Sequence, residues 1–154
     1  MYKRQGAFSA ITVETVVNVE KTDTWACIAR RDVTWGVGAF TLEIDRDTKL
    51  ADFACYDLTP RKVYSTSDVA DTGWHHVVGM WDGSCLRIYV DGVLEGEEST
   101  SGSVKARDAP IYIGGGSSEL VLKGQIALVR IYNRALSEAE VSEHFEAVRG
   151  LLGL

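Results

Sequence analysis

The chain has 154 residues, a length that suits one domain with a core of useful size. Hydrophobic residues make up 45% of it and charged residues 25%, which is ordinary for a globular protein. The formal net charge of −6 argues against a nucleic-acid partner, because phosphate binding needs clustered Lys and Arg. No apolar run has the length of a membrane span, so we expect no membrane insertion. No apolar signal segment is visible, and the sequence by itself does not indicate a cellular location.

The first half of the chain consists of short runs that alternate between apolar and polar residues. Residues 11–19 place Ile and Val at every second position, and residues 25–30 form a second run. Residues 40–44 and 50–56 flank the polar stretch 45–49, which predicts a hairpin. These patterns are typical of antiparallel strands.

The clearest prediction lies between residues 74 and 98, after a looser region with possible short strands at 62–65. Residues 74–81 and 85–90 read as strands, with turns at Asp82-Gly83 and Asp91-Gly92. An Asp-Gly pair favours a tight hairpin turn, because the turn needs positive φ at its central positions. We therefore expect a three-stranded antiparallel meander.

The end of the chain changes from strand to helix. Residues 111–113 and 124–132 alternate again, and Ser137-Glu-Ala-Glu140 has the form of a helix capping box. Gly150 stands where we expect the helix to end. About ten short strands predict an all-β fold, a two-sheet antiparallel jelly-roll sandwich with one short C-terminal helix.

Several motifs in this order resemble a known family. The sequence is similar to laminin-G-like domains of the concanavalin A-like lectin/glucanase superfamily through Trp74-His-His-Val, the Asp82-Gly turn, Leu86-x-Ile-Tyr-Val-Asp-Gly92, Ile113-Gly and Gly124-x-Ile-x-x-Val-Arg-Ile-Tyr-Asn-Arg-Ala-Leu-Ser137-x-x-Glu140. The resemblance implies two curved antiparallel sheets and an appended carbohydrate-binding or adhesive module. It also implies an extracellular or surface-displayed location.

Two departures from the family concern the start of the chain and one late strand. Ala127 stands where many relatives have an acidic residue, and relatives usually begin with an extra strand that contains Phe-Asp-Gly. Residues 2–5 look like translated adapter sequence, so we expect residues 1–9 to be a non-native or disordered start and residues 10–154 to be a single domain that lacks its first strand. A missing strand leaves an uncovered sheet edge through which the protein would self-associate.

Catalytic chemistry has one candidate motif, Glu43-x-Asp45-x-Asp47. Related glucanases carry three acids on alternate residues of one strand, and a retaining mechanism places two carboxyl groups roughly 5 Å apart. The simpler interpretation is that Glu43 faces solvent while residues 45–49 form a hairpin turn. Because that interpretation explains the Asp, Thr and Lys of the turn directly, we expect no enzyme activity.

Histidine, cysteine and metal chemistry have weaker candidates. His75 and His76 are adjacent on a strand and therefore point to opposite faces. Cys27, Cys55 and Cys85 lack the spacing of a zinc site and read as buried free thiols. No cofactor is required, but the family resemblance allows a structural calcium, for which Asp32 and Asp108 are the candidates, with Asp82 and Asp91 as further oxygen ligands.

Sugar binding usually depends on exposed aromatic faces beside polar groups. The candidates are Trp35, Tyr64, Tyr56 and Trp81, with Trp25 as a further one. We therefore expect a non-catalytic recognition module for a glycan or a surface protein, within a larger surface or secreted protein. A structural or adhesive subunit of a phage or cell-surface assembly is the first alternative, and a glucanase- or lyase-type enzyme is the second.

Overall fold

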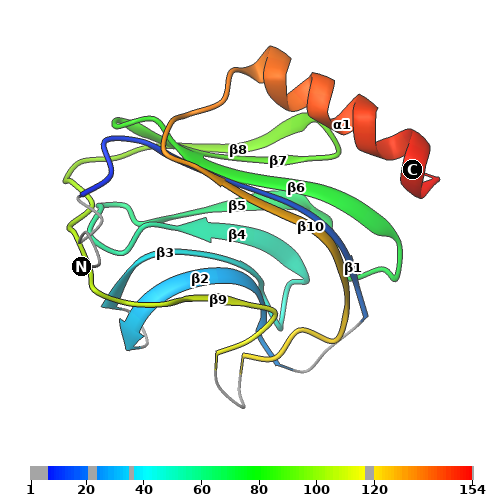
Figure 1. Cartoon of the computed structure of the whole chain (residues 1–154), viewed down its shortest axis with the longest axis horizontal. Helices are drawn as coiled ribbons and strands as arrows, with labels where there is room; N and C mark the ends of the chain where they lie inside the picture. The colour runs from blue at the N-terminus through cyan, green and yellow to red at the C-terminus, as the bar shows by residue number, and fades with distance from the viewer. Residues whose placement is uncertain (1–6, 21–23, 35–36, 117–119, 154) are drawn as a thin grey trace, which may run out of the picture.

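The computed structural model describes residues 7–20, 24–34, 37–116 and 120–153, which form two antiparallel sheets stacked face to face (Figure 1). Sheet A has the strand order β10 (Gly124–Tyr132), β1 (Ile11–Val19), β6 (Trp74–Trp81), β7 (Cys85–Val90) and β8 (Val93–Ser99). Sheet B has the order β5 (Lys62–Asp68), β4 (Leu50–Ala54), β3 (Val37–Ile44), β2 (Ala26–Thr34) and β9 (Ile111–Ile113). The predicted sandwich is confirmed.

The core lies between the two sheets and is filled by alternate residues of both. In β3, Phe40, Leu42 and Ile44 point inward, and in β1 the inward residues include Ile11, Val13 and Val17. The free thiols of all three cysteines are buried, as predicted.

Strand β1 is buried on both of its faces, which its alternating sequence does not indicate. Glu14 is fully buried although it occupies a polar position of the pattern. The reason is that α1 (Glu138–Leu152) lies across the outer face of sheet A (Figure 1). Glu14 is therefore buried because α1 covers the face of sheet A on which it lies.

The meander of β6, β7 and β8 follows the predicted turns. Asp91 and Gly92 have φ of 51° and 79°, as the tight turn requires, and Gly83 has φ of 102°. The three strands are consecutive neighbours in sheet A. Before this meander in the chain, the expected short strands near residues 62–65 form one longer strand, β5.

Helix α1 begins at the predicted capping box and ends three residues later than expected. Ser137 Oγ accepts from the backbone N–H of Glu140, whose side chain accepts from the backbone N–H of Ser137. Gly150 lies inside the helix, and Gly153 with φ of 70° terminates it, so the prediction of Gly150 as the end is wrong. Val141 and Leu136 pack against Val78, Met80 and Tyr89 of sheet A.

The start of the chain contacts the core. Residues 1–6 lie outside the described residues, whereas the side chain of Phe8 packs against the main hydrophobic cluster. The expectation that residues 1–9 are non-native and that a first strand is missing stays a prediction. None of the described helices is long and apolar enough to cross a membrane.

Candidate functional site

A cavity of about 400 Å³ opens on the outer face of sheet B, the face turned away from sheet A. Strand alternation explains this lining: Leu42 and Ile44 point into the core, so Glu43 between them points outward. In Figure 1, β2 and β3 bow toward sheet A, so this outer face is concave. The lining residues come from β3, β5, the segment before β2 and the loop after β4: Trp25, Glu43, Tyr56, Pro60, Arg61, Lys62 and Tyr64.

Lys62 pairs with two carboxylates beneath the cavity. Its Nζ lies 3.1 Å from Oε1 of Glu43 and 3.0 Å from Oδ1 of Asp52. Glu43 and Asp52 are direct cross-strand partners in β3 and β4, which brings their side chains to the same face. The exposed side-chain fractions are 19% for Lys62, 7% for Glu43 and 0% for Asp52, so the Lys62 side chain is the most accessible of the three.

The protonation of this cluster follows from its burial. Burial and the neighbouring charge of Glu43 raise the pKa of Asp52 to about 7. Neither carboxylate oxygen of Asp52 has a hydrogen-bond partner among the described residues, so the Lys62 charge is its main compensation. Burial opposes the charge on Lys62, but Asp52 and Glu43 outweigh that effect and raise the pKa of Lys62 above its ordinary value. At neutral pH, Lys62 is charged and Asp52 is near its titration midpoint.

Three aromatic rings surround the two cationic side chains. Lys62 Nζ lies 4.8 Å from the ring centroid of Trp25 and 5.8 Å from that of Tyr64. The guanidinium carbon of Arg61 lies 5.8 Å from the ring centroid of Tyr56, whose hydroxyl is 2.9 Å from Thr41 Oγ1. The cavity therefore combines aromatic faces with hydrogen-bond donors and acceptors.

The structure brings some of the predicted ligand-binding residues together and separates others. Tyr56, Tyr64 and Trp25 line one cavity. Trp81 does not reach it, because its side chain is 3% exposed and belongs to the core, which corrects the expectation that it binds ligand. Trp35 lies outside the described residues.

The acidic motif divides between the cavity and a turn. The predicted hairpin turn is present, because Asp45 Oδ1 accepts from the backbone N–H groups of Asp47 and Thr48. The expectation that Glu43 faces solvent is wrong, since Glu43 is 6% exposed and pairs with Lys62. The three acids therefore do not form one cluster.

Sequence reasoning missed Asp52, Lys62 and Arg61 as parts of the site. Asp52 carried a signal, because it is the one charged residue in the apolar run 50–56. Arg61 and Lys62 carried none, since two adjacent basic residues near a loop are common. Only the pairing of β3, β4 and β5 brings these side chains beside Glu43.

The calcium candidates can be placed only in part. Asp108 is exposed, and the side chain of Asp32 lies outside the described part of the structure. Asp82 accepts from the N–H groups of Ser84 and Cys85, and Asp91 accepts from the N–H of His76. Across the described residues no group of three or more His, Cys, Asp or Glu side chains could hold a metal ion. Structural calcium stays a prediction.

The adjacent histidines point to opposite sides, as expected. His75 contacts Asp91 Oδ2 at 2.8 Å and Asp71 Oδ1 at 3.0 Å, and the hydrogen bond with Asp91 contributes most to raising its pKa to about 9. His76 Nε2 lies 3.0 Å from the buried Glu14, which His144 of α1 also contacts. Both rings are therefore engaged in structural contacts.

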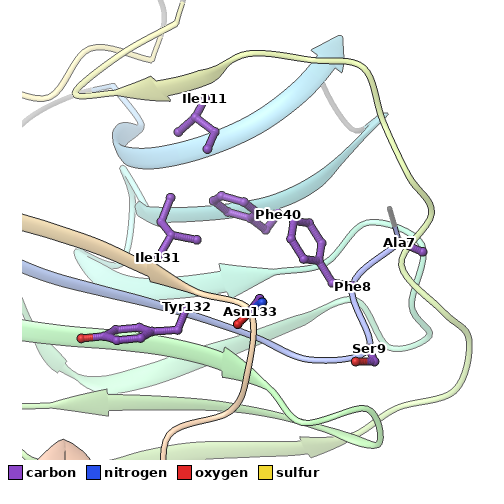
Figure 2. Close-up of a pocket in the computed structure, with 8 residues that line it drawn as sticks. All are labelled: Ala7, Phe8, Ser9, Phe40, Ile111, Ile131, Tyr132 and Asn133. Atoms are coloured by element: carbon purple, nitrogen blue, oxygen red, sulfur yellow. The ribbon is translucent and has the colours of Figure 1, made fainter. Parts of the chain in front are cut away.

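A second cavity, of about 530 Å³, lies where the edges of the two sheets separate. Figure 2 shows Phe8, Phe40 and Ile131 pointing into the space between the sheets. Among the described residues, no charged side chain lines this cavity. It adjoins β9 and β10, which end their sheets, and Ile111 and Ile113 of β9 are 44% and 58% exposed. Self-association through this uncovered edge stays a prediction.

Several solved structures have a fold similar to that of this chain. A heptameric SAP-like pentraxin from Limulus polyphemus has 14% identity and a TM-score of 0.68, covering 89% of this chain and 70% of its own. A candidate carbohydrate-binding protein from Bacteroides ovatus has 20% identity and a TM-score of 0.71, covering 93% of this chain and 42% of its own. The binding domain of Paraclostridial Mosquitocidal Protein 1 has 13% identity and a TM-score of 0.65, and the match covers 91% of this chain and 37% of that structure's chain.

The chain therefore spans less than half the length of the latter two proteins, and identities this low establish the fold alone. No curated protein sequence matches the chain. A family model described as the concanavalin A-like lectin/glucanases superfamily matches residues 3–142, nearly the whole chain. With the laminin-G-like motifs and the observed sandwich, this match shows that the chain belongs to the concanavalin A-like lectin/glucanase superfamily.

Proposed function

We propose that the chain is a non-catalytic carbohydrate-recognition module whose ligand binds in the concave cavity of sheet B. The observation that carries this proposal is the convergence of Trp25, Tyr56 and Tyr64 around one cavity with a charged floor. Aromatic faces stack on the apolar faces of pyranose rings, and Lys62 and Glu43 supply a donor and an acceptor for hydroxyl groups. The fold neighbour from Bacteroides ovatus, a candidate carbohydrate-binding protein, supports the same class of ligand.

The two carboxylates are poorly placed for catalysis. A retaining glycosidase needs one carboxylate free to attack the sugar and a second carboxylic acid within reach of the leaving oxygen. Asp52 is fully buried and does not line the cavity, and Glu43 is held by Lys62. These contacts favour binding over bond cleavage.

Hydrolysis remains the second candidate because Asp52 has a raised pKa beside Glu43, the kind of pairing found in acid–base sites. The test is to follow release of reducing ends from β-glucans by the native protein and by Glu43→Gln. We expect no turnover by either protein. Turnover that Glu43→Gln abolishes would support the enzyme.

Binding is tested on a glycan array, followed by calorimetric titration of the hits. We expect at least one glycan to bind with millimolar or tighter affinity. Replacing Tyr64 by Ala removes an exposed ring of the cavity and should weaken binding about tenfold, equivalent to ~1.4 kcal/mol. Tyr112→Ala is the matched control, because Tyr112 is 37% exposed on β9 and does not line the cavity.

Two outcomes contradict the proposal. Binding that depends on Tyr112 and not on Tyr64 places the ligand elsewhere. Absence of any glycan binding, together with a single ordered assembly in light scattering, favours the structural or adhesive subunit instead.

A further inference from the structure

The charged side chains that line the concave cavity are mainly cationic. Of its lining residues, Arg61 and Lys62 carry positive charge and Glu43 carries negative charge. The Glu43 side chain is 7% exposed and its Oε1 lies 3.1 Å from Lys62 Nζ, so part of its negative charge is compensated within the protein. Asp52 lies beneath the ammonium group and does not reach the cavity. The accessible part of the site therefore has a surplus of positive charge.

Arg61 is the source of that surplus. Its side chain is exposed and its guanidinium carbon lies 5.8 Å from the ring centroid of Tyr56. Within the described ranges, Arg61 forms no ion pair with an Asp or Glu side chain, unlike Arg87, Arg107 and Arg134. A guanidinium group presents donors in a planar fork that matches a carboxylate or sulfate group in two parallel hydrogen bonds.

Lys62 adds a second contact for an anion. Lys62 Nζ donates to Glu43 Oε1 and forms an ion pair with Asp52, and an ammonium group has three protons, so it retains donor capacity for a ligand in the cavity. Trp25 and Tyr64 flank this ammonium group, so a sugar ring stacked on them would bring its substituents close to Lys62.

From these contacts we infer that the ligand of the cavity is an acidic glycan, whose ring carboxylate or sulfate is bound by Arg61 with support from Lys62. The inference rests on the proposed glycan binding and names its ligand class. The overall charge of −6 does not oppose it, because charges more than about 8 Å away are largely screened at physiological ionic strength.

The experiment compares matched pairs of oligosaccharides that differ only in charge. One arm uses oligouronates and their methyl esters, and the other uses sulfated oligosaccharides and their desulfated forms, each titrated into the full chain. We expect an acidic member to bind at least tenfold more tightly than its neutral counterpart. Its affinity should fall as NaCl is raised from about 0.05 to about 0.5 M. The arm that binds identifies the anionic group.

Variants then place the anion at Arg61. Arg61→Gln should weaken binding of the acidic member about ten- to a hundredfold, and Arg61→Lys should recover part of the loss because it restores the charge without the fork. Arg149→Gln removes one positive charge from the exposed surface of α1, on the far side of sheet A, and should leave binding unchanged.

The failure of this inference is distinguishable from failure of the proposed function. If neutral and acidic members bind equally and Tyr64→Ala weakens both while Arg61→Gln weakens neither, the cavity binds glycans but does not select acidic ones. If no oligosaccharide of either arm and no glycan of the array binds, both proposals fail.

Discussion

Asp52 is a buried carboxylate whose only nearby positive charge, among the described residues, is shared with Glu43. Taking a carboxylate out of water costs free energy, and one ammonium group cannot fully compensate two acids. The consequence is the raised pKa of about 7, which means that the folded protein binds a proton at Asp52 that the unfolded chain releases near pH 4.

Replacing Asp52 by Asn tests this description. The folded pKa is raised above the ordinary 3.8, so ionised Asp52 destabilises the fold increasingly as pH rises from about 4 to about 7. Asn removes this penalty, so the stability of the variant relative to the native protein should be higher at pH 8 than at pH 5. Urea unfolding followed by tryptophan fluorescence measures the difference.

Asp47→Asn is the control, because the Asp47 side chain is 77% exposed in the neighbouring turn. It should change stability by less than about 0.5 kcal/mol at either pH. A stability difference for Asp52→Asn that is the same at pH 5 and pH 8 would contradict the raised pKa.

At the residue level, contacts between residues close in sequence could be predicted, whereas contacts between residues far apart in sequence could not. Asp45 was expected in a turn because its side chain bonds to backbone groups two and three residues away. The burial of Glu43 depends on Lys62, 19 residues further along the chain. No local pattern contains that information, so Glu43 was expected in solvent.

At the level of elements, the strands of the meander were predicted well because their turns are encoded locally. Asp91-Gly92 and the capping box at Ser137 both act within a few residues of themselves. The end of α1 was not predictable from Gly150, because an exposed glycine is tolerated inside a helix at a modest cost. The helix continues to Gly153, which adopts the left-handed conformation that ends it.

Replacing Ser137 by Ala should destabilise the protein by about 1 kcal/mol, because an early helical N–H loses its acceptor. The loss should appear as a lower midpoint of urea unfolding with an unchanged slope. Ser142→Ala, an exposed position inside the same helix, should have a neutral or slightly stabilising effect. Equal effects of the two substitutions would show that the cap contributes nothing.

At the level of the whole molecule, Glu14 connects the last helix to the sandwich. Its carboxylate is fully buried and contacts His76 of β6, Tyr132 of β10 and His144 of α1. Burial raises its pKa, but the hydrogen bonds from His76 and Tyr132 outweigh this effect and lower the pKa to about 2. The charged form of Glu14 therefore holds three strands of sheet A and the helix together.

Three titrations with different signs then shape the pH dependence of stability. Glu14 contributes stability that is present above its ordinary pKa of 4.5 and is lost as pH falls toward 2. His75, whose pKa is raised from 6.5 to about 9, contributes stability that is present below pH 6.5 and is lost as pH rises toward 9. Asp52 adds a penalty that grows between about pH 4 and pH 7.

These opposing slopes place the maximum of the unfolding free energy near pH 5, on the acid side of neutrality. Urea unfolding at intervals from pH 3 to pH 9 measures the profile directly. Glu14→Gln should reduce the slope on the acid side, where Asp82 and Glu140, whose pKa values are also lowered to about 2, keep contributing. His75→Asn should reduce the slope on the alkaline side. A native profile that is highest at pH 8 would mean that the contacts of His75 and Asp52 do not set their protonation as the structure indicates.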